Sequence, residues 1–394
     1  RIGQLQEKAG NFSLHERREM LRIILEQMQT IVPRYRELAE KGKVELCMSP
    51  YGHPIVPLLL DINSAREAMP DVHLPVSTEY PGGLARAQWH IDKGLATFQR
   101  VFGQRPRGIW PSEGGLSQAN LQLFADNGFK WTASGGSVLH NSHDAHGKSC
   151  SHRVYRFGEA EIDCVFRDDG LSDLIGFTYS DWHSEDAVSN LIGHMENIAD
   201  VCPDRDDCLI SIILDGENAW EYYPQNGDYF LKHLYKALAE HPRLELTTFG
   251  HFLVDETHEP AAEDHLTAGS WVYGTFSTWI GDPDKNRAWE LLIEAKRSFD
   301  EVVASGTLTE EELEAAELQL AVCEGSDWFW WFGDYNPSST VEQFDQLFRI
   351  HLANLYHMLR IEAPPYLSDV ISRGGGRPTR GGVMRHHNEN GGSH

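Results

Sequence analysis

The sequence is poor in basic residues: 34 Lys and Arg stand against 59 Asp and Glu in 394 residues, and the formal net charge is −25. Nucleic-acid binding needs clustered Lys and Arg that contact phosphates, so a chain this acidic is a poor candidate for it. The same charge argues against docking on anionic membranes, and no apolar run approaches the roughly 20 residues of a membrane span. We therefore expect a neutral or cationic ligand, with no nucleic-acid and no membrane partner. The sequence leaves the oligomeric state open.

Cysteine is also scarce. The six cysteines form no C-x-x-C pair, which disfavours a structural zinc site or a redox motif, and they are too few for a disulfide framework. This usage favours a reducing compartment, and we expect a cytoplasmic location. The sequence begins at Arg1 without a signal-peptide pattern, although a signal peptide lost upstream of Arg1 would be invisible.

No G-x-G-x-x-G motif follows a predicted strand, which disfavours a dinucleotide-binding fold. Short apolar runs nevertheless alternate with amphipathic stretches from residue 43 to about residue 249. This alternation predicts an α/β fold with a mainly parallel sheet, either doubly wound or closed as a barrel. The predicted strands are Val44–Met48, Gly108–Trp110, Phe129–Ala133, Cys164–Phe166, Leu209–Leu214 and Leu244–Thr248. Several of them end in polar residues, as strands of α/β barrels do at their catalytic face.

Helical patterns flank this region. Ser13 and Glu16 form a capping box for a long N-terminal helix, which Pro33 should kink or divide and Gly42 should end. After about residue 260 the strand pattern stops, and three helices are predicted. They cover Asp284–Ser305, Thr309–Cys323 and Val341–Leu359. We therefore expect a catalytic barrel over residues 1–258, a helical region over residues 259–368 that contributes to the active-site cleft, and a disordered tail over residues 369–394.

The segment W-P-S-E-G-G at residues 110–115 is the strongest local signal. It places the carboxylate of Glu113 in a turn at a strand end, beside the indole of Trp110. Glycines let a ligand approach the backbone, and an indole offers a stacking face for a sugar or a base. A turn with a solvated glutamate is the simpler interpretation of this motif taken alone.

A second signal lies at residues 211–221, where an apolar strand leads directly into D-G-E-N-A-W-E. Burial next to the sheet would raise the pKa of the Asp215 carboxyl, which suits a general acid. A helix N-cap with an acidic first turn is the alternative. Two carboxylates at the ends of separate parallel strands, each beside a tryptophan, are typical of glycoside hydrolysis.

Other polar and aromatic segments fit a sugar site. The acidic stretch that contains Asp173 supplies Arg167 as a partner for a carboxylate, and His53 lies between Gly and Pro at a strand end. Tryptophan-rich turns near Trp271 and Trp328 offer faces for pyranose rings, although core packing is the alternative for each ring. The spacing of four histidines resembles metal ligation, but their stretch has little apolar support, and we predict a solvated loop without zinc. These are His140, His143, His146 and His152.

Together these motifs resemble glycoside hydrolase family 57, most closely its amylopullulanase-like and α-amylase-like members. The resemblance covers most of the chain, from about residue 12 to residue 367. The segments that carry it are GKVELCMSPYGHPIVPLLLD, GIWPSEGG, FRDDGLSDLIGF, ILDGENAWEYY, GSWVYGTFSTWIGDPDKNRAWELL and EGSDWFWWFGD.

The resemblance implies a (β/α)7-type barrel followed by a helical region, and retaining cleavage of α-glucans such as starch or glycogen without a metal or other cofactor. It implies Glu113 as the nucleophile and Asp215 as the acid/base. We expect further residues to contact the α-glucan. These are His53, Trp110, Asp173, Glu217, Trp220, Trp271, Asp327 and Trp328.

The family's first motif, of His-Gln-Pro type, has no counterpart before Gly42, so we expect an N-terminally incomplete barrel that is unstable and inactive as it stands. Alternatives remain open for the function. The same carboxylates would serve a 4-α-glucanotransferase or a branching enzyme, because only the acceptor differs. A glucan-binding fragment without catalysis, or a zinc-dependent carbohydrate deacetylase that uses the histidines, are the other possibilities. The sequence does not distinguish α-1,4 from α-1,6 preference.

Overall fold

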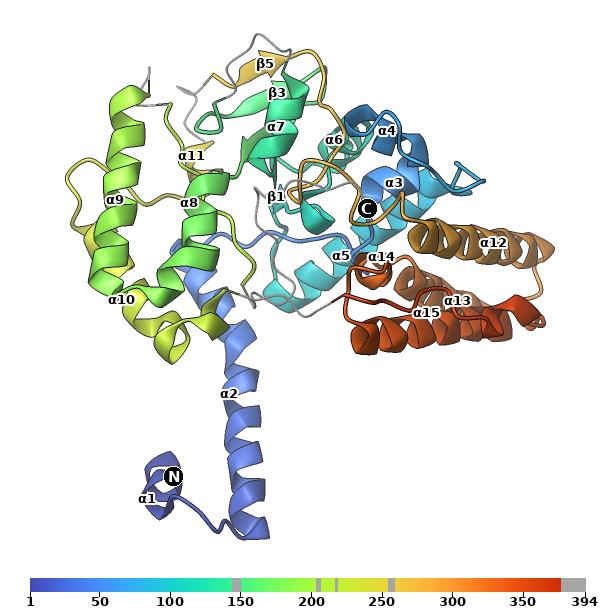
Figure 1. Cartoon of the computed structure of the whole chain (residues 1–394), viewed down its shortest axis with the longest axis horizontal. Helices are drawn as coiled ribbons and strands as arrows, with labels where there is room; N and C mark the ends of the chain where they lie inside the picture. Colours follow the sequence, from blue (N-terminus) through green and yellow to red (C-terminus); the bar gives the residue numbers. More distant parts are fainter. Residues whose placement is uncertain (144–149, 203–206, 217–218, 254–258, 377–394) are drawn as a thin grey trace.

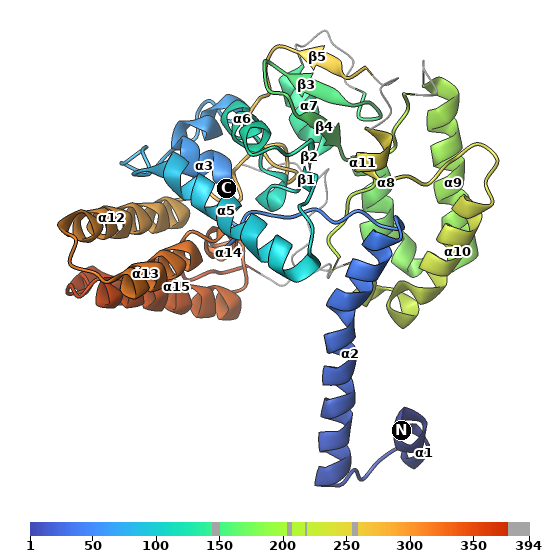
Figure 2. The same cartoon turned by 180° about the vertical axis from the view of Figure 1, so that it is seen from behind.

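The computed structural model describes residues 1–143, 150–202, 207–216, 219–253 and 259–376. A small sheet runs from β1 near the centre of the molecule to β5 at its upper edge, with helices on both sides (Figure 1). Helices α9 (Ser184–Val201) and α10 (Asp228–Ala239) pack on one side, and α12 (Pro283–Ser305), α13 (Glu310–Cys323) and α15 (Ser338–Met358) form a bundle on the other. The view from behind shows the same arrangement, with the sheet between the two helical groups (Figure 2).

The sheet is mainly parallel. Its strands are β1 (Gly108–Ile109), β2 (Trp131–Ser134), β3 (Tyr155–Phe157), β4 (Asp163–Phe166) and β5 (Ala261–Glu263), in the order β1-β2-β4-β3-β5. β1, β2 and β4 run parallel, whereas β3 is antiparallel to β4. Because β2 and β4 pair in register up to Ser134 and Phe166, the segments after these strands begin at one edge. The predicted α/β class with a parallel sheet is confirmed.

Three predicted strands are not regular strands here. Val44–Met48 forms a single parallel bridge, between Met48 and Ile109, and Leu244–Thr248 is not part of the described ladder. Leu209–Leu214 lies beside β4 and accepts a backbone hydrogen bond at Ser211 from Asp168, with an N···O distance of 2.8 Å. In Leu209–Leu214 the apolar run lies partly buried without a full hydrogen-bond ladder, whereas Leu244–Thr248 is partly exposed, with Leu246 51% exposed. β5, which pairs in parallel with β3, is a strand within the region predicted to be helical.

The N-terminal arm consists of α1 (Ile2–Lys8) and α2 (Leu14–Glu40) and extends away from the body (Figure 1). The predicted capping box of Ser13 and Glu16 is present, and the chain turns at Gly42 with a φ of 64°. Of the two predicted effects of Pro33, a kink or a division, division does not occur, because α2 continues through it. A proline removes one hydrogen bond of the helix, and seven residues of helix follow Pro33 to keep the chain in register.

The remaining helices connect the strands or cover the sheet. They are α3 (Val56–Leu60), α4 (Ala65–Ala68), α5 (Gly83–Phe102), α6 (Gln118–Asp126), α7 (Gly136–Ser142), α8 (Asp169–Asp173), α11 (Phe249–Phe252) and α14 (Ser326–Trp331), with short 3₁₀ or π turns at η1 (Ile62–Ser64), η2 (Ser112–Gly114), η3 (Leu174–Thr178), η4 (Tyr179–Asp181), η5 (Trp220–Tyr222), η6 (Pro224–Gly227) and η7 (Pro365–Ser368). Across the described residues, no helix combines the length and the hydrophobicity that a membrane span requires.

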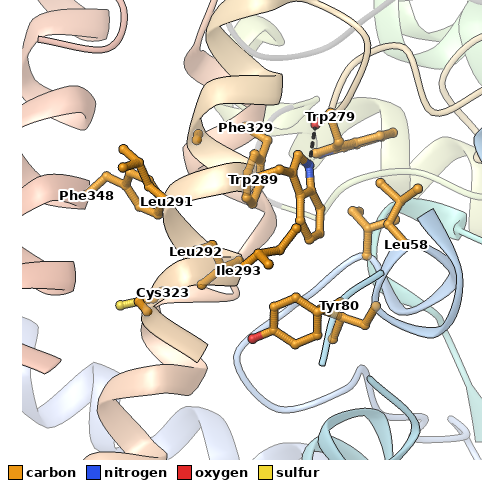
Figure 3. Packing of buried hydrophobic residues seen from close by; sticks show 14 of the residues in the cluster. Leu58, Tyr80, Trp279, Trp289, Leu291, Leu292, Ile293, Cys323, Phe329 and Phe348 are labelled. Atoms are coloured by element: carbon orange, nitrogen blue, oxygen red, sulfur yellow. Dashed lines mark hydrogen bonds between the residues drawn. The ribbon is translucent and has the colours of Figure 1, made fainter. Parts of the chain in front are cut away.

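The largest hydrophobic cluster joins the helical bundle to the α/β part (Figure 3). Trp289 of α12 stacks on Phe329 of α14 with ring centroids 4.5 Å apart, and its indole N–H donates to the carbonyl of Trp279 over 3.0 Å. The cluster continues to Leu58 of α3 and to Phe348 of α15, and all five side chains are buried. A shared core of this kind fixes the position of the bundle relative to the sheet.

A buried carboxylate reinforces this junction. Glu324, just after α13, is 1% exposed and accepts hydrogen bonds from the Tyr80 hydroxyl (2.6 Å) and the Arg86 guanidinium (2.8 Å), with His90 at 2.8 Å. Burial alone would raise the pKa of Glu324, but Arg86 and His90 outweigh it and lower the pKa to about 2. Glu324 is therefore ionised at neutral pH and holds α5 against the bundle.

Part of the predicted tail is bound to the bundle. The backbone N–H of Ile371 donates to Asp345 over 2.7 Å, and the Ser372 hydroxyl accepts from the N–H of Gly333 over 3.0 Å. Gly376 forms a parallel bridge with Pro337. Residues 369–376 therefore differ from the expectation of a disordered tail, and residues 377–394 lie outside the described residues. The sequence of this segment is rich in glycine and does not itself indicate order. The order comes from binding partners that lie elsewhere in the chain.

The buried ion pair yields a stability prediction. Arg86→Ala should lower the free energy of unfolding by about 3–5 kcal/mol, because it leaves the buried Glu324 carboxylate without its main cation. Lys93→Ala, on the same helix, is the matched control: Lys93 pairs with Glu314 at the surface, and its loss should cost about 1 kcal/mol or less. Urea unfolding of both variants measures the difference. Equal losses would contradict the assignment of Glu324 as the anchor of the bundle.

Candidate active site

Glu113 lies in a strained turn that directly follows β1. Its φ of 56° and ψ of 29° place a non-glycine residue in the left-handed region, and Gly114 follows with a φ of 60°. The turn is closed by the N–H of Gly114, which donates to the carbonyl of Pro111 over 2.9 Å. A left-handed non-glycine residue costs on the order of 1–3 kcal/mol and persists where surrounding contacts impose it. Contacts with Trp271 hold Glu113 in this left-handed conformation.

Trp271 holds both the backbone and the side chain of Glu113. Its backbone N–H donates to the Glu113 carbonyl over 3.2 Å, and its indole Nε1–H donates to Glu113 Oε2 over 3.1 Å. The Trp110 ring packs edge-on against the Trp271 ring, with centroids 5.1 Å apart. A Cβ at Gly135 would lie 2.7 Å from the Trp271 Cα, so glycine is required there for the close approach. One carboxylate oxygen of Glu113 is thus fixed by an indole donor.

Arg167 connects this turn to the next strands. It follows β4, is 8% exposed, and pairs with Asp169 (2.9 Å) and Asp173 (2.8 Å). Its guanidinium carbon lies 5.8 Å from the centroid of the Trp271 ring, within the range of a cation–π contact. Its Nε–H donates to the carbonyl of Ile213 over 2.9 Å. Arg167 therefore touches the tryptophan that holds Glu113 and the segment that precedes Asp215.

Asp215 is half-buried and lies two residues beyond Ile213. The segment before it is fixed by the hydrogen bond from Asp168 to Ser211 and by the N–H of Ile213, which donates to the Ser172 hydroxyl over 3.3 Å. Asp215 thus follows a segment that adjoins β4, as Glu113 follows β1, and both lie at the carboxyl edge of the sheet. The predicted contact residue Glu217 lies outside the described residues.

Hydrogen bonds also link the strand ends along this edge. The Ser134 hydroxyl, at the end of β2, donates to the carbonyl of Gly114 over 2.5 Å, and the N–H of Arg167 donates to the Ser134 carbonyl over 2.9 Å. The row from β1 through β2 and β4 to the 209–214 segment is therefore continuous. This continuity is what brings the turns after separate strands to one face.

His53 approaches the same edge from the segment that follows the Met48 bridge. It is half-buried, its φ is 56°, and its Nδ1 lies 2.9 Å from the hydroxyl of Ser326 at the start of α14. The N–H of Ser326 also donates to the His53 carbonyl over 3.0 Å. Ser326 is a partner that the sequence did not suggest, because only the folded bundle brings it to His53.

The other predicted contact residues lie elsewhere. Trp220 packs on Tyr223 and Phe230 in the cluster of α9 and α10, with centroids 5.4 and 6.2 Å away. The Trp328 indole donates to the carbonyl of Val322 over 2.7 Å, and its ring packs against α15. Asp327 is exposed on α14. The structure thus gathers Glu113, Trp110, Trp271 and Asp173 around Arg167. It places the rings of Trp220 and Trp328 in hydrophobic packing instead.

Two of the predicted metal-binding histidines have different carboxylate partners. His152 Nε2 lies 2.8 Å from Asp168, and His143 Nδ1 lies 3.5 Å from Glu263. His140 lies in α7, and His146 is outside the described residues. Among the residues that the structure describes, no group of three or more His, Cys, Asp or Glu could hold a metal ion. The absence of zinc stays a prediction, which elemental analysis of the purified protein would test.

These features define an α/β protein with acidic residues in the segments that follow the strands of a mainly parallel sheet. The chain belongs to glycosyl hydrolase family 57, because the sequence model of that family matches residues 2–262. The expected family membership is confirmed. No curated protein sequence matches the chain significantly.

Several solved structures share the fold at low sequence identity. A family 57 branching enzyme from Thermococcus kodakaraensis is 16% identical with a TM-score of 0.68, over 90% of this chain and 74% of that one. The α-amylase AmyC from Thermotoga maritima is 16% identical with a TM-score of 0.62, over 90% and 76%. A 4-α-glucanotransferase from Thermococcus litoralis is 13% identical with a TM-score of 0.55, over 84% and 51%. These likenesses support the (β/α)7-type fold.

The pair of His152 and Asp168 yields a pH prediction. Burial opposes the charged form of His152, but hydrogen bonds to Asp168 and Cys150 raise its pKa to about 9. A raised pKa adds stability that is complete below the unfolded value of about 6.5 and is lost as the pH rises through about 9. His152→Gln should therefore lower Tm more at about pH 6 than at about pH 10. His265→Gln, at an exposed pair with Glu67, is the control, and equal losses for His152→Gln at both pH values would contradict the prediction.

Proposed function

We propose that the protein is a retaining enzyme that cleaves α-glucosidic bonds in α-glucans such as starch, glycogen or maltooligosaccharides. The observation that carries this proposal is the Glu113 carboxylate, held at the end of β1 by the Trp271 indole, with Asp215 on the same sheet edge. Family membership supports the reaction class. The similar structures include enzymes named for α-glucan chemistry, which supports the substrate class.

The proposed first step uses both carboxyl groups. Glu113 attacks the anomeric carbon while Asp215 donates its proton to the glycosidic oxygen, and the C–O bond to the leaving sugar breaks. The Trp271 indole N–H engages Oε2 of Glu113 and so helps to orient the carboxylate for attack. The indole also fixes the rotamer of Glu113, which reduces the reorganisation needed to reach the transition state.

In the proposed second step, Asp215 removes a proton from an acceptor hydroxyl, which then attacks the anomeric carbon and releases Glu113. Arg167 pairs with both Asp173 and Asp169 beside the site, which reduces the repulsion that these carboxylates would exert on the ionised Glu113. The Trp110 and Trp271 rings, both half-buried, offer apolar surface to a pyranose. No metal takes part in either step.

Transfer to a sugar acceptor is the second candidate. The first step, in which Glu113 displaces the leaving sugar, is the same, and in the second step the acceptor is a glucan hydroxyl in place of water. The likeness to a branching enzyme and to a 4-α-glucanotransferase favours testing it. Incubation with maltoheptaose distinguishes the two, because hydrolysis releases new reducing ends, whereas transfer redistributes chain lengths or linkages at a constant number of reducing ends.

The two carboxylates should differ in their kinetic signatures. Glu113→Gln should lower kcat on maltooligosaccharides by about 10⁴-fold or more while binding persists, because only the nucleophile is lost. Asp215→Asn should also abolish turnover of starch but keep activity on α-glucosyl fluoride, whose leaving group needs little protonation. Glu161→Gln, an exposed position before β4, is the matched control and should leave kcat unchanged.

Two results would contradict these roles. Full activity of Glu113→Gln would exclude it as the nucleophile. Equal loss of glycosylation on both substrates in Asp215→Asn would show that Asp215 is not the acid, and Asp173 would then be the next residue to replace.

The indole donor has a separate test. Trp271→Phe keeps an aromatic ring but removes the N–H that binds Glu113 Oε2, and should lower kcat about tenfold, which corresponds to about 1.4 kcal/mol, with a small change in KM. Trp182→Phe, at an exposed tryptophan beside α9, is the control and should leave both constants unchanged. A tenfold change in KM at constant kcat would show that Trp271 binds substrate and does not position the nucleophile.

A further inference from the structure

Three free thiols gather at one place, at the end of α9 and beside β4. Cys202 is the residue that ends α9, Cys208 leads into the 209–214 segment, and Cys150 precedes β3. The N–H of Leu209 donates to the carbonyl of His152 over 2.9 Å, which brings the chain around Cys208 against the chain around Cys150. All three thiols are half-buried, so small molecules reach them more easily than large ones.

A histidine–aspartate pair adjoins the first of these thiols. His152 Nε2 lies 2.8 Å from Asp168 Oδ2, and Asp168 is itself fixed because its other oxygen accepts from the N–H of Leu171 over 2.8 Å. The side chain of His152 is also hydrogen-bonded to the Cys150 thiol, and this bond lowers the pKa of Cys150, with a further contribution from Arg153. Because the pKa of His152 is about 9, the imidazole is a cation at neutral pH. Thiolates next to such a cation are the reactive form of cysteine.

The Cys208 thiol has the opposite character. Burial and a hydrogen bond with Cys202 raise the pKa of Cys208 to about 12, and the charge of Cys150 contributes to the same shift. Cys208 therefore remains a protonated thiol at neutral pH and lies close enough to Cys150 to interact with it. One activated thiolate beside a neutral thiol is the arrangement found where oxidation of the first is resolved by the second.

We propose that Cys150 is a peroxide-reactive thiolate, oriented by the pair of His152 and Asp168, whose oxidised form is captured by Cys208 as a disulfide. The site would take hydrogen peroxide or another small hydroperoxide as its oxidant. It lies apart from the contacts of Glu113, and the inference does not rest on the proposed function.

The chemistry balances in two steps. The Cys150 thiolate attacks one peroxide oxygen, the O–O bond breaks, and the leaving hydroxide takes a proton from the His152 imidazolium to form water. Sulfur is thereby oxidised by two electrons to a sulfenic acid, and the peroxide is reduced. Cys208 sulfur then attacks Cys150 sulfur, the S–O bond breaks, and the thiol proton leaves with the hydroxide as a second water. The product is a Cys150–Cys208 disulfide, which a dithiol reductant reverses.

The first test maps the products on the full chain. Reduced protein is treated with equimolar hydrogen peroxide at neutral pH, blocked with an alkylating agent, and digested for mass spectrometry. We expect a Cys150–Cys208 disulfide as the main product. In Cys208→Ser, dimedone should label Cys150 as a trapped sulfenic acid, and in Cys150→Ser neither product should form. Oxidation spread evenly over the six cysteines, or a disulfide in Cys150→Ser at the wild-type rate, would overturn the proposal.

The second test measures the role of the imidazole. At neutral pH, Cys150 should react with iodoacetamide at least about tenfold faster than Cys47, whose pKa is raised to about 11 by desolvation and by Glu45. His152→Gln should remove most of that advantage while the rate at Cys47 stays constant, and Cys47 thus reports whether the fold is retained. An unchanged Cys150 rate in His152→Gln would exclude activation by His152.

Discussion

The arrangement of the molecule depends on one buried negative charge. The Glu324 carboxylate lies at the junction between the helical bundle and α5, where water is excluded, and its ionised form is stable there because Tyr80, Arg86 and His90 all bind it. Removing a charge from water is costly, so these partners must be in place together. The requirement ties three residues near the start of the α/β part to a residue in the bundle, more than 230 positions away.

Residues next to this Glu324 cluster also contact the candidate site. Ser326, two residues after Glu324, binds both the ring and the carbonyl of His53, and His90 is bonded to the backbone of Tyr51. The chain around His53 is thus fixed from two sides by groups adjoining the Glu324 cluster. At the opposite end of the edge, Arg167 and Trp271 connect the Glu113 turn with the segment before Asp215. The site is therefore positioned by the bundle and the sheet together.

The local signals in the sequence predicted well what they could physically determine. The capping box at Ser13 starts α2 as expected, and a capping box at Thr309 starts α13 in the same way, because a cap involves residues only three positions apart. Apolar runs predicted several strand segments, but not which of them form a ladder. Leu244–Thr248 reads as a strand and has no regular pairing among the described residues, since pairing depends on neighbours that the run itself does not specify.

In the candidate site, too, local features could be predicted from the sequence, whereas contacts between distant residues could not. The W-P-S-E-G-G motif predicted the turn around Glu113, because proline and glycine restrict the backbone locally. The indole bond from Trp271 to Glu113 joins residues 158 positions apart, and that from His53 to Ser326 joins residues 273 positions apart. Tertiary contacts of this kind are not encoded in any short pattern. For the same reason, the motif around Trp328 suggested a contact with sugar, whereas in the fold its ring packs against α15.

The left-handed backbone of Glu113 has a consequence for how this region can change. Glycine adopts that conformation without steric cost, and Asn and Asp tolerate it better than Glu does. A Glu113→Gly exchange would thus relieve local strain while it removes the carboxylate. At this position the fold and the proposed chemistry favour different residues. Selection for stability alone would replace the glutamate, so its presence indicates a compromise between stability and activity.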